Sequence, residues 1–344
     1  MNDVLNALTE RVTESRHTGH SLRIQGGDSK AHIIGRDCLA DGTLNIAEYR
    51  GVSDYQPSEL VLSARAGTGI GELQQLLNEQ GQTLPFDPPA FGGRATLGGT
   101  LACNLNGPAR PWLGSVRDAV LGVQLINGAG ELLNFGGKVM KNVAGYDVSR
   151  LQAGALGTLG VITEVHLKVL PLPESCLTLA YETNAQQALA LMAEHARQPK
   201  PLTGACWLDG RMYLRLAGAE RAVQHTAREW GGEHADDAIW AQLRDLQHPF
   251  FDGEAPLWRL ATDVHTPTSS ESPQCIDWGG SQRWLRTKPA TVPAGSHLTL
   301  FAGGDRRTEV RGELDDVQKR LQLRLKRSMD PDGVLNPGRL YSWM

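Results

Sequence analysis

The sequence predicts an α+β protein built from two domains. The chain has 344 residues, which is long for one minimal hydrophobic core. Apolar residues recur at helical spacing in some segments and in short strand-like runs in others, in mixed order along the chain. The run Leu-Pro-Leu-Pro at 170–173 interrupts this pattern. We therefore expect a first domain at 1–172 and a second domain after it.

The first domain is expected to open with an amphipathic helix, because Val4, Leu5, Leu8 and Val12 recur at helical spacing. A second helix is predicted at 70–79, closed by Gly81. Short apolar runs bounded by turn residues predict strands. These strands are expected at 21–25, 44–47, 59–66, 119–126 and 160–169.

The second domain reads as a compact α+β unit. Helices are predicted at 185–196 and 219–230, and a polar loop at 264–274. Strands are expected at 176–181, twice within 204–216, near 275–286 and at 297–302. A charged helix at 311–327 follows, with its apolar residues on one stripe: Leu314, Val317, Leu321 and Leu325.

Composition excludes several classes of function. Lys and Arg number 34 against 38 Asp and Glu, so the net charge of -4 gives no general attraction to nucleic acid. The five cysteines lie at least 30 positions apart and form no iron–sulfur motif. They are expected to be buried small residues in a reducing compartment. The N-terminus does not resemble a signal peptide and no apolar run is long enough for a transmembrane segment, so we expect a cytoplasmic protein.

Three loops rich in glycine and small residues stand out among the 39 glycines of the chain. They lie at 25–30, 96–118 and 154–162. Such loops let a phosphate approach successive backbone N–H groups closely. Taken alone, the first loop fits an ordinary hairpin turn better than a phosphate site. Three such loops together favour a site for one large phosphorylated ligand.

A second glycine pattern resembles the dinucleotide fingerprint of a Rossmann unit but does not fit it. Gly67, Gly69 and Gly71 follow a predicted strand and precede a helix. The fingerprint needs its third glycine at position 72, where this chain has Glu72. The P-loop pattern GxxxxGK[ST] is absent from the sequence. We therefore do not expect a Rossmann or P-loop nucleotide site.

The order of the three loops resembles the FAD-binding domain of the vanillyl-alcohol oxidase and p-cresol methylhydroxylase (PCMH) family across residues 1 to about 172. Segments 66–68 and 84–88 resemble that family as well. The resemblance implies a two-subdomain FAD-binding domain of the PCMH type, followed by a smaller α+β cap domain at 173–327. It also implies that a tail at 328–344 returns to the flavin domain.

The same resemblance implies which residues hold FAD. The first loop would hold the pyrophosphate through Gln25, Gly26, Gly27, Asp28, Ser29 and Lys30, with Asp28 where a third glycine is usual in the family. The other implied contacts come from the later loops and the tail. They are Pro85, Thr96, Gly98, Gly99, Asn104, Gly107, Ser115, Arg117, Asp118, Gly160, Val161, Ile162 and Asn336.

The tail at 330–340 resembles that of the 2-hydroxy-acid dehydrogenase branch, and the block at 141–148 is similar to that of glycolate oxidase flavoproteins, most of all their smaller flavin subunits. This implies oxidation of glycolate to glyoxylate in a complex with a larger flavoprotein subunit and an iron–sulfur subunit. Association with the inner face of a membrane would then come through those partners. Two alternatives stay open: a stand-alone flavoprotein dehydrogenase for another 2-hydroxy acid, and a non-catalytic structural subunit.

The sequence names no catalytic residue. Oxidation of a 2-hydroxy acid needs a cation for the carboxylate and a base for the hydroxyl proton. Larger members of the branch carry a histidine-rich metal motif, of which 295–300 retains only His297, so no metal site is expected. A surface histidine at a strand end is the simpler interpretation of His297. Arg283, Arg286 and Lys288 are candidates for the carboxylate or form a solvated charged face, and Lys141 and Tyr146 are candidates for positioning substrate or flavin or for a structural role.

FAD is expected to be noncovalent. Covalently flavinylated relatives use a histidine or cysteine near these loops, and the first loop has neither; His32 and Cys103 are the nearest. Tryptophans gather in the second half of the chain. Core packing of the cap domain is preferred over a partner surface for Trp207, Trp230, Trp240, Trp258, Trp278 and Trp284.

Overall fold

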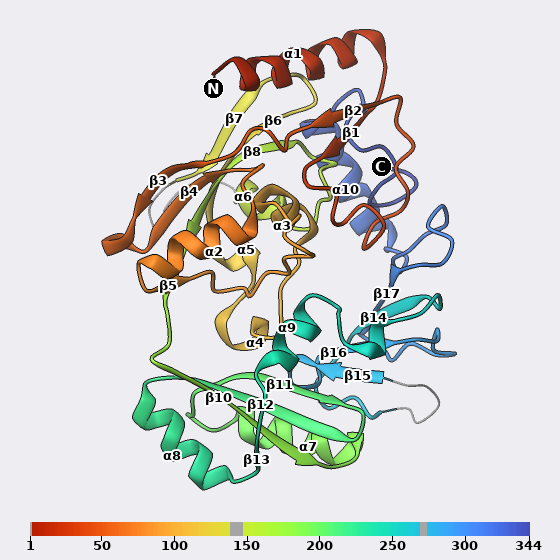
Figure 1. Ribbon diagram of the computed structural model, residues 1–344. Helices are drawn as coiled ribbons and strands as arrows, with labels where there is room; N and C mark the ends of the chain where they lie inside the picture. Colours follow the sequence, from red (N-terminus) through yellow and green to blue (C-terminus); the bar gives the residue numbers. More distant parts are fainter. Residues whose placement is uncertain (1, 138–146, 269–273) are drawn as a thin grey trace. The chain divides into compact units, whose positions relative to one another are not determined.

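The computed structural model describes residues 2–137, 147–268 and 274–344 (Figure 1). The chain divides into two compact units. The first unit contains 1–105, 115–171 and 305–344, and the second contains 106–114 and 172–304. This division differs from the expected domains in two places. The segment 106–114 joins the second unit, and 305–327 joins the first unit together with the tail.

A five-stranded sheet organises the first unit, in the order β3-β4-β8-β6-β7. Every neighbouring pair in this sheet is antiparallel. The central strand β8 (Val161–Lys168) buries Val165 and Leu167 on one face and turns Glu164 and His166 toward the other. A Rossmann unit needs parallel strands joined by helices, so the exclusion of that fold is confirmed.

The other elements of the first unit surround this sheet. A parallel pair β1-β2 and a short antiparallel pair β5-β9 stand apart from it. The bounds are α1 Asn2–Thr18, β1 Leu22–Gln25, β2 Gly42–Asn45, β3 Val52–Gln56, η1 Pro57–Glu59, β4 Val61–Arg65, α2 Ile70–Glu79, β5 Gln82–Thr83, α3 Leu97–Cys103, α5 Val116–Ala119, β6 Val120–Ile126, β7 Leu132–Gly136, α6 Val148–Leu151, β9 Leu170–Pro171 and α10 Asp316–Met329.

Helix α2 shows how local sequence decides an element in this unit. Its residues Ile70, Leu73 and Leu77 recur at helical spacing and are fully buried in the core. The chain leaves the helix at Gly81, whose φ of +65° suits a residue without a side chain. The helix predicted at 70–79 is therefore confirmed at both ends.

Helix α10 differs from the prediction at its start and in its buried face. It begins at Asp316 because the Asp315 side chain accepts hydrogen bonds from the backbone N–H of Val317 and Gln318. Val317 and Leu321 are 55% and 58% exposed. Within the helix, Leu325 is the member of the predicted stripe that packs against the core, next to the buried Lys326 and Met329, so the helix packs through its C-terminal end.

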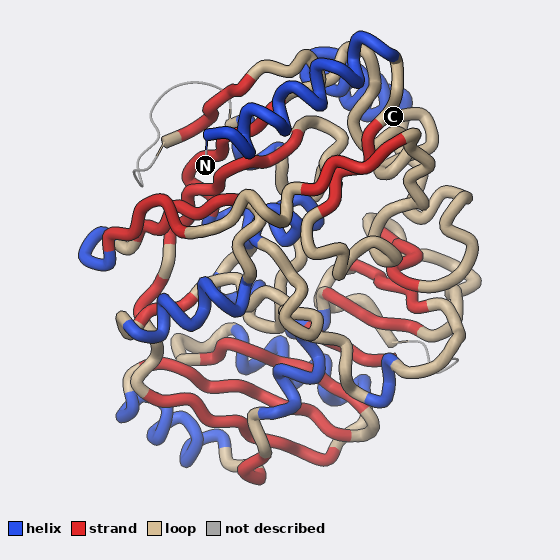
Figure 2. Tube along the Cα trace, turned by 45° about the horizontal axis from the view of Figure 1, so that its top comes forward, coloured by secondary structure: helices blue, strands red, loops and turns tan. Residues whose placement is uncertain are grey.

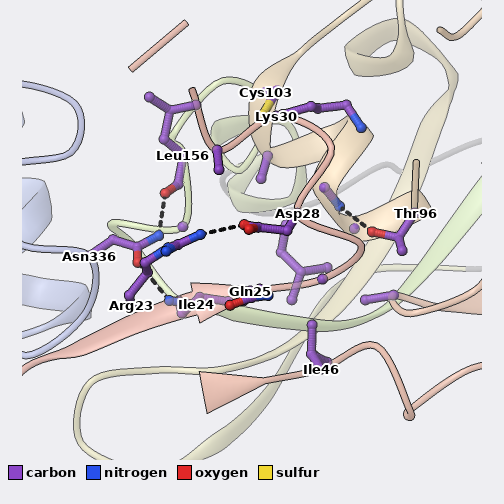
Figure 3. A pocket seen from close by; sticks show the side chains of 18 of the residues that line it. Arg23, Ile24, Gln25, Asp28, Lys30, Ile46, Thr96, Cys103, Leu156 and Asn336 are labelled. Atoms are coloured by element: carbon purple, nitrogen blue, oxygen red, sulfur yellow. Dashed lines mark hydrogen bonds and ion pairs between the residues drawn. The ribbon is translucent and has the colours of Figure 1, made fainter. Parts of the chain in front are cut away.

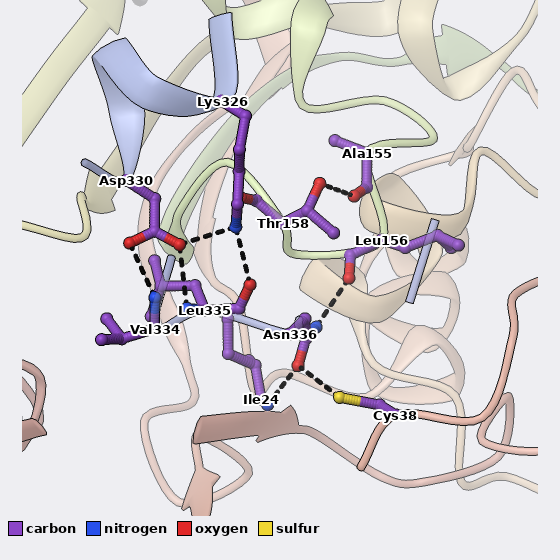
Figure 4. Close-up of polar contacts among 10 residues, drawn as sticks. All are labelled: Ile24, Cys38, Ala155, Leu156, Thr158, Lys326, Asp330, Val334, Leu335 and Asn336. Carbon is purple, nitrogen blue, oxygen red and sulfur yellow. Dashed lines mark hydrogen bonds and ion pairs between the residues drawn. The ribbon is translucent and has the colours of Figure 1, made fainter. Parts of the chain in front are cut away.

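The C-terminal tail runs beside β1 and is held by a buried lysine (Figure 4). The Lys326 ammonium donates to the carbonyls of Thr158 and Leu335 at 2.8 and 2.9 Å and to the Asp330 carboxylate at 2.6 Å. All three of its donors are therefore satisfied. The same carboxylate accepts from the backbone N–H of Val334 and Leu335. The ion pair thus fixes the turn that leads into the tail.

The second unit is built on an eight-stranded sheet in the order β13-β10-β12-β11-β15-β16-β14-β17 (Figure 2). Helices α7 and α8 pack on its β10, β11 and β12 strands and share one apolar core with them. The bounds are α4 Arg110–Leu113, β10 Ser175–Glu182, α7 Ala185–Ala196, β11 Leu202–Leu208, β12 Arg211–Gly218, α8 Glu220–Trp230, β13 Glu233–Ala235, α9 Ala238–Arg244, η2 Pro249–Phe251, β14 Leu257–Ala261, β15 Gln274–Asp277, η3 Trp278–Gly280, β16 Gln282–Leu285 and β17 His297–Ala302.

The tryptophans of the second unit belong to its packing. Trp240 and Trp284 are buried, and the other four are half-buried. The Trp207 indole donates to the Thr183 carbonyl, and the Trp240 indole donates to the Thr178 hydroxyl. The preferred interpretation as core residues is confirmed for Trp240 and Trp284, and Trp207 and Trp230 pack against the core of this unit. Within the described ranges, no helix has the length and apolar character needed to span a lipid bilayer.

The Lys326 pair predicts a large and specific loss of stability. Lys326→Met leaves the Asp330 carboxylate, which is 1% exposed, without its counter-charge. We expect the free energy of unfolding to fall by about 3–5 kcal/mol. The matched control is Arg11→Met, which removes an exposed ion pair with Glu14 worth about 0.2–1 kcal/mol. Urea unfolding of the two variants measures the difference, and equal small losses would contradict the assigned role.

Candidate cofactor-binding site

A pocket in the first unit brings parts of all three glycine-rich loops together with the tail (Figure 3). The pocket is partly open to solvent. Its lining comes from β1, the three loops and the tail, so a ligand bound there would contact segments from both ends of the chain.

The first loop approaches its neighbours so closely that two of its positions admit no side chain. A Cβ on Gly27 would lie 1.7 Å from the Arg94 carbonyl oxygen, and one on Gly26 would lie 2.7 Å from the Thr96 hydroxyl. Both glycines line the pocket. Their backbone is therefore open to a ligand on the pocket side, as a phosphate-binding loop requires.

Asp28 occupies the left-handed region of backbone space, with a φ of +55°. Glycine adopts this conformation without strain, and aspartate is among the side chains that tolerate it best. The Asp28 carboxylate pairs with the Arg23 guanidinium, which fixes the side chain at the rim of the loop. The structure thus explains how an aspartate can adopt the backbone conformation at the position where a third glycine is usual.

Two cations of the pocket have no carboxylate partner among the described residues. Lys30 is 7% exposed, and its ammonium contacts the Ser29 hydroxyl at 3.3 Å. Arg339 donates to the backbone carbonyls of Arg36, Lys30 and Ile33. Burial lowers the pKa of both Lys30 and Arg339, because a charge in a dry environment is costly. An anionic ligand would remove that cost.

The second loop is ordered by a helix cap. The Thr96 hydroxyl accepts from the Gly99 N–H at 3.3 Å and so begins α3. A Cβ on Gly98 would lie 2.6 Å from the Ala66 Cβ, so only glycine lets α3 approach Ala66, the residue after β4, this closely. These contacts place Thr96, Gly98 and Gly99 in the pocket wall.

Asn336 joins the first loop, the third loop and the tail (Figure 4). Its side-chain oxygen accepts from the Ile24 N–H at 2.7 Å, and its amide nitrogen donates to the Leu156 carbonyl at 2.6 Å. Leu156 itself has a positive φ of 54°. The tail therefore positions two walls of the pocket at once.

Most residues predicted to hold a cofactor line this one pocket. They are Gln25, Gly26, Gly27, Asp28, Ser29, Lys30, Thr96, Gly98, Gly99, Gly160, Ile162 and Asn336. The sequence interpretation missed Ile46, Cys38 and Arg339 as lining residues. The position of Arg339 directly after the Asn-Pro-Gly turn was a usable signal, whereas nothing local marks Ile46 or Cys38.

The remaining predicted residues lie outside the pocket lining: Pro85, Asn104, Gly107, Ser115, Arg117, Asp118 and Val161. Ser115 and Asp118 cap α5 reciprocally. The Gly107 carbonyl accepts from the Trp278 indole within the second unit. Structural roles therefore account for these three positions.

The catalytic candidates of the second unit either make other contacts or are exposed. His297 begins β17 and is exposed, as its simpler interpretation predicts. Arg283 is 3% exposed and donates to the Pro267 and Thr266 carbonyls, so the expectation of a solvated face is wrong for it. Arg286 donates to the Phe251 and Gly253 carbonyls, and Lys288 lies over the Trp258 ring. Lys141 and Tyr146 fall outside the described residues.

The expectation that the cysteines are buried is met only in part. Cys206 and Cys275 are buried, whereas Cys176 is exposed. Cys38 and Cys103 line the pocket. Burial raises the pKa of both thiols, which keeps them protonated and weakly nucleophilic. His32 is exposed and lies outside the lining.

Comparisons with known proteins identify the domain in which this pocket lies. The family model of the FAD binding domain matches residues 5–136. Glycolate oxidase subunit GlcE of Escherichia coli (strain K12) is 43% identical over 348 residues, which covers 99% of this chain and 98% of that protein. Glycolate oxidase subunit GlcD of Bacillus subtilis (strain 168) is 30% identical over 162 residues, covering 46% of this chain and 34% of that protein. A solved structure of alkyldihydroxyacetonephosphate synthase has a TM-score of 0.68 at 15% identity, covering 96% of this chain and 75% of that one, and shows the fold alone.

The fold and the matched domain define the class as FAD-binding oxidoreductases with a PCMH-type domain. The α+β fold class and the resemblance drawn from the glycine loops are thereby confirmed. Within this class, the chain belongs to the family of glycolate oxidase subunit GlcE.

The crowding at Gly27 predicts a loss of cofactor without a general loss of helix or sheet. Gly27→Ala forces the loop away from the Arg94 carbonyl, so we expect FAD affinity to fall at least about tenfold, or 1.4 kcal/mol. Gly71→Ala is the matched control, because a Cβ there meets nothing within 4 Å. The measurements are FAD bound per chain and the urea midpoint of each apoprotein. Equal FAD affinity in the two variants would contradict the assigned loop.

Proposed function

We propose that the chain binds FAD noncovalently in the pocket of the first unit. Two observations in one pocket carry this proposal. The loop backbone at Gly26 and Gly27 is closely packed, and two cations beside it, Lys30 and Arg339, lack carboxylate partners among the described residues. The loop backbone and Lys30 would hold the pyrophosphate, whose charge offsets the cost of burying them. When bound, FAD supplies an acceptor for a hydride.

We propose further that the chain acts as the FAD-binding subunit of a 2-hydroxy-acid dehydrogenase that oxidises glycolate to glyoxylate. The support is the full-length likeness to a protein named as a glycolate oxidase subunit. Electrons would pass to a larger flavoprotein subunit and an iron–sulfur subunit. In this proposal the complex is cytoplasmic and reaches the inner face of the membrane through its partners, because the electrons leave to a membrane acceptor.

The second unit would serve as the cap domain, which contacts the substrate or a partner subunit. The expected cap at 173–327 then corresponds to the eight-stranded sheet and its helices at 172–304. Among the described residues of that unit we identify no base and no free cation for the carboxylate, since His297 is exposed and Arg283 donates to backbone carbonyls. That observation favours a second candidate, in which the chain holds FAD as an electron relay and a partner subunit carries out the oxidation.

An anaerobic titration of the purified protein with glycolate tests the proposal. The visible spectrum first shows whether flavin is present, and glycolate is then added stepwise. Bleaching of the flavin by glycolate alone would show that this chain takes the hydride. Flavin that is present but does not bleach would favour the relay. A colourless protein that also fails to bind added FAD would contradict the cofactor assignment itself.

The noncovalent attachment makes a separate prediction. Acid precipitation of the holoprotein should release all of the flavin into the supernatant, because the pocket thiols are protonated and His32 lies outside the lining. Cys103→Ser should release the same amount. Yellow colour retained in the wild-type pellet and lost in Cys103→Ser would identify a cysteinyl bond instead.

A further inference from the structure

Arg23 is an arginine of the pocket wall, and most of its donors have no partner among the described residues. It lies in β1, just ahead of the first glycine loop, and it lines the pocket. Its Nη2 donates to the Asp28 carboxylate, and no other described residue accepts from this guanidinium. An arginine carries five N–H donors in a planar fork. The remaining donors are therefore available to a ligand.

The other arginine in the pocket wall is used differently. Arg339 donates to three backbone carbonyls, so its guanidinium holds segments of the chain together. The pair of Arg23 with Asp28 joins two side chains that are 36% and 37% exposed. An ion pair as open to water as this contributes little to stability. The fold alone therefore does not explain why an arginine lies at position 23.

The guanidinium of Arg23 lies at the mouth of the first loop. The N–H groups of Leu22 and Ile24 donate to the tail, so the strand is fixed on both sides of Arg23. The Arg23 side chain reaches from this strand to Asp28, near the far end of the loop (Figure 3). Both side chains line the same pocket as the loop backbone between them. An anion held by that backbone would therefore meet the guanidinium as well.

The charges of the pocket fit a pyrophosphate only when Arg23 is counted. The charged residues that line the pocket are Arg23, Asp28, Lys30 and Arg339. Each phosphate of a pyrophosphate diester carries a negative charge, so the Asp28 carboxylate by itself would repel this ligand. The guanidinium of Arg23 compensates the carboxylate and leaves the pocket with an excess of positive charge.

We propose that Arg23 is a ligand of the cofactor's pyrophosphate, and that it donates through the N–H groups that Asp28 leaves open. A guanidinium suits a phosphate because its parallel donors match two phosphate oxygens. The inference rests on the proposed function. It goes beyond that function by adding a strand residue to the loop backbone and Lys30, and by giving the carboxylate in the loop a partner that the ligand shares.

The test compares the affinities of the apoprotein for FAD and for ADP, which keeps a pyrophosphate and lacks the flavin. Both are measured by calorimetry. We expect Arg23→Gln to weaken both at least about tenfold, because hydrogen bonds between charged groups are lost. Arg23→Lys should weaken them less, because it keeps the charge. The matched control is Arg11→Gln, which removes an exposed ion pair with Glu14 outside the lining and should leave both affinities unchanged.

A second background separates phosphate binding from simple compensation of the carboxylate. Asp28→Gly removes the carboxylate, and glycine adopts the φ of +55° at this position without strain. If Arg23 contacts the ligand, Arg23→Gln in this background again weakens ADP binding at least about tenfold. A smaller loss there overturns the inference, because Arg23 then acts only on Asp28.

The outcomes also separate this inference from the proposed function. Unchanged affinities in Arg23→Gln overturn the inference, and so does a loss for FAD without a loss for ADP, which assigns the residue to the flavin half of the cofactor. If the wild type binds no FAD, the proposed function fails. ADP binding, and its loss in Arg23→Gln at an unchanged melting temperature, then decides the inference by itself. A wild type that binds neither compound overturns both.

Discussion

The side chain of Asn336 makes the contact on which the proposed site depends. It accepts from the Ile24 N–H, directly before the first glycine loop, and donates to the Leu156 carbonyl in the third loop. The two loops are more than one hundred residues apart in the sequence, so local structure alone cannot set their separation. Asparagine suits this task because one short amide carries both an acceptor and a donor. The spacing of the pocket walls is thus set by a residue of the tail.

The buried Lys326 and Asp330 pair keeps Asn336 in place. The carboxylate accepts two backbone N–H groups of the turn, and the ammonium reaches the Thr158 carbonyl in the third loop. A buried ion pair contributes little net stability over an apolar alternative, but it fixes geometry because each lost partner is costly. The helix α10 therefore serves to present a rigid turn, which explains why its C-terminal end packs and its first turns remain exposed.

The sequence predicted those features that short stretches of chain decide. Helices α2 and α7 and strand β17 have the predicted bounds, because their apolar spacing and end residues are local. The glycine loops were found for the same reason, since a close backbone approach leaves glycine at the position itself. The start of α10, the burial of Arg283 and the place of Arg339 depend on segments that meet only in the folded chain.

The tail contributes both the contact that spaces the loops and one cation of the pocket, Arg339. Its guanidinium donates to the Lys30 carbonyl, so a tail that separates from the first loop takes this charge away from the pocket. An anion bound between Lys30 and Arg339 therefore stabilises the docked tail, and a docked tail raises the affinity for the anion by the same factor. The buried cations lower the stability of the fold when the pocket holds no anion. A bound anion compensates their charge and removes this penalty. Anion binding and the docking of the tail are thus thermodynamically linked through Lys30 and Arg339, which lie near opposite ends of the chain.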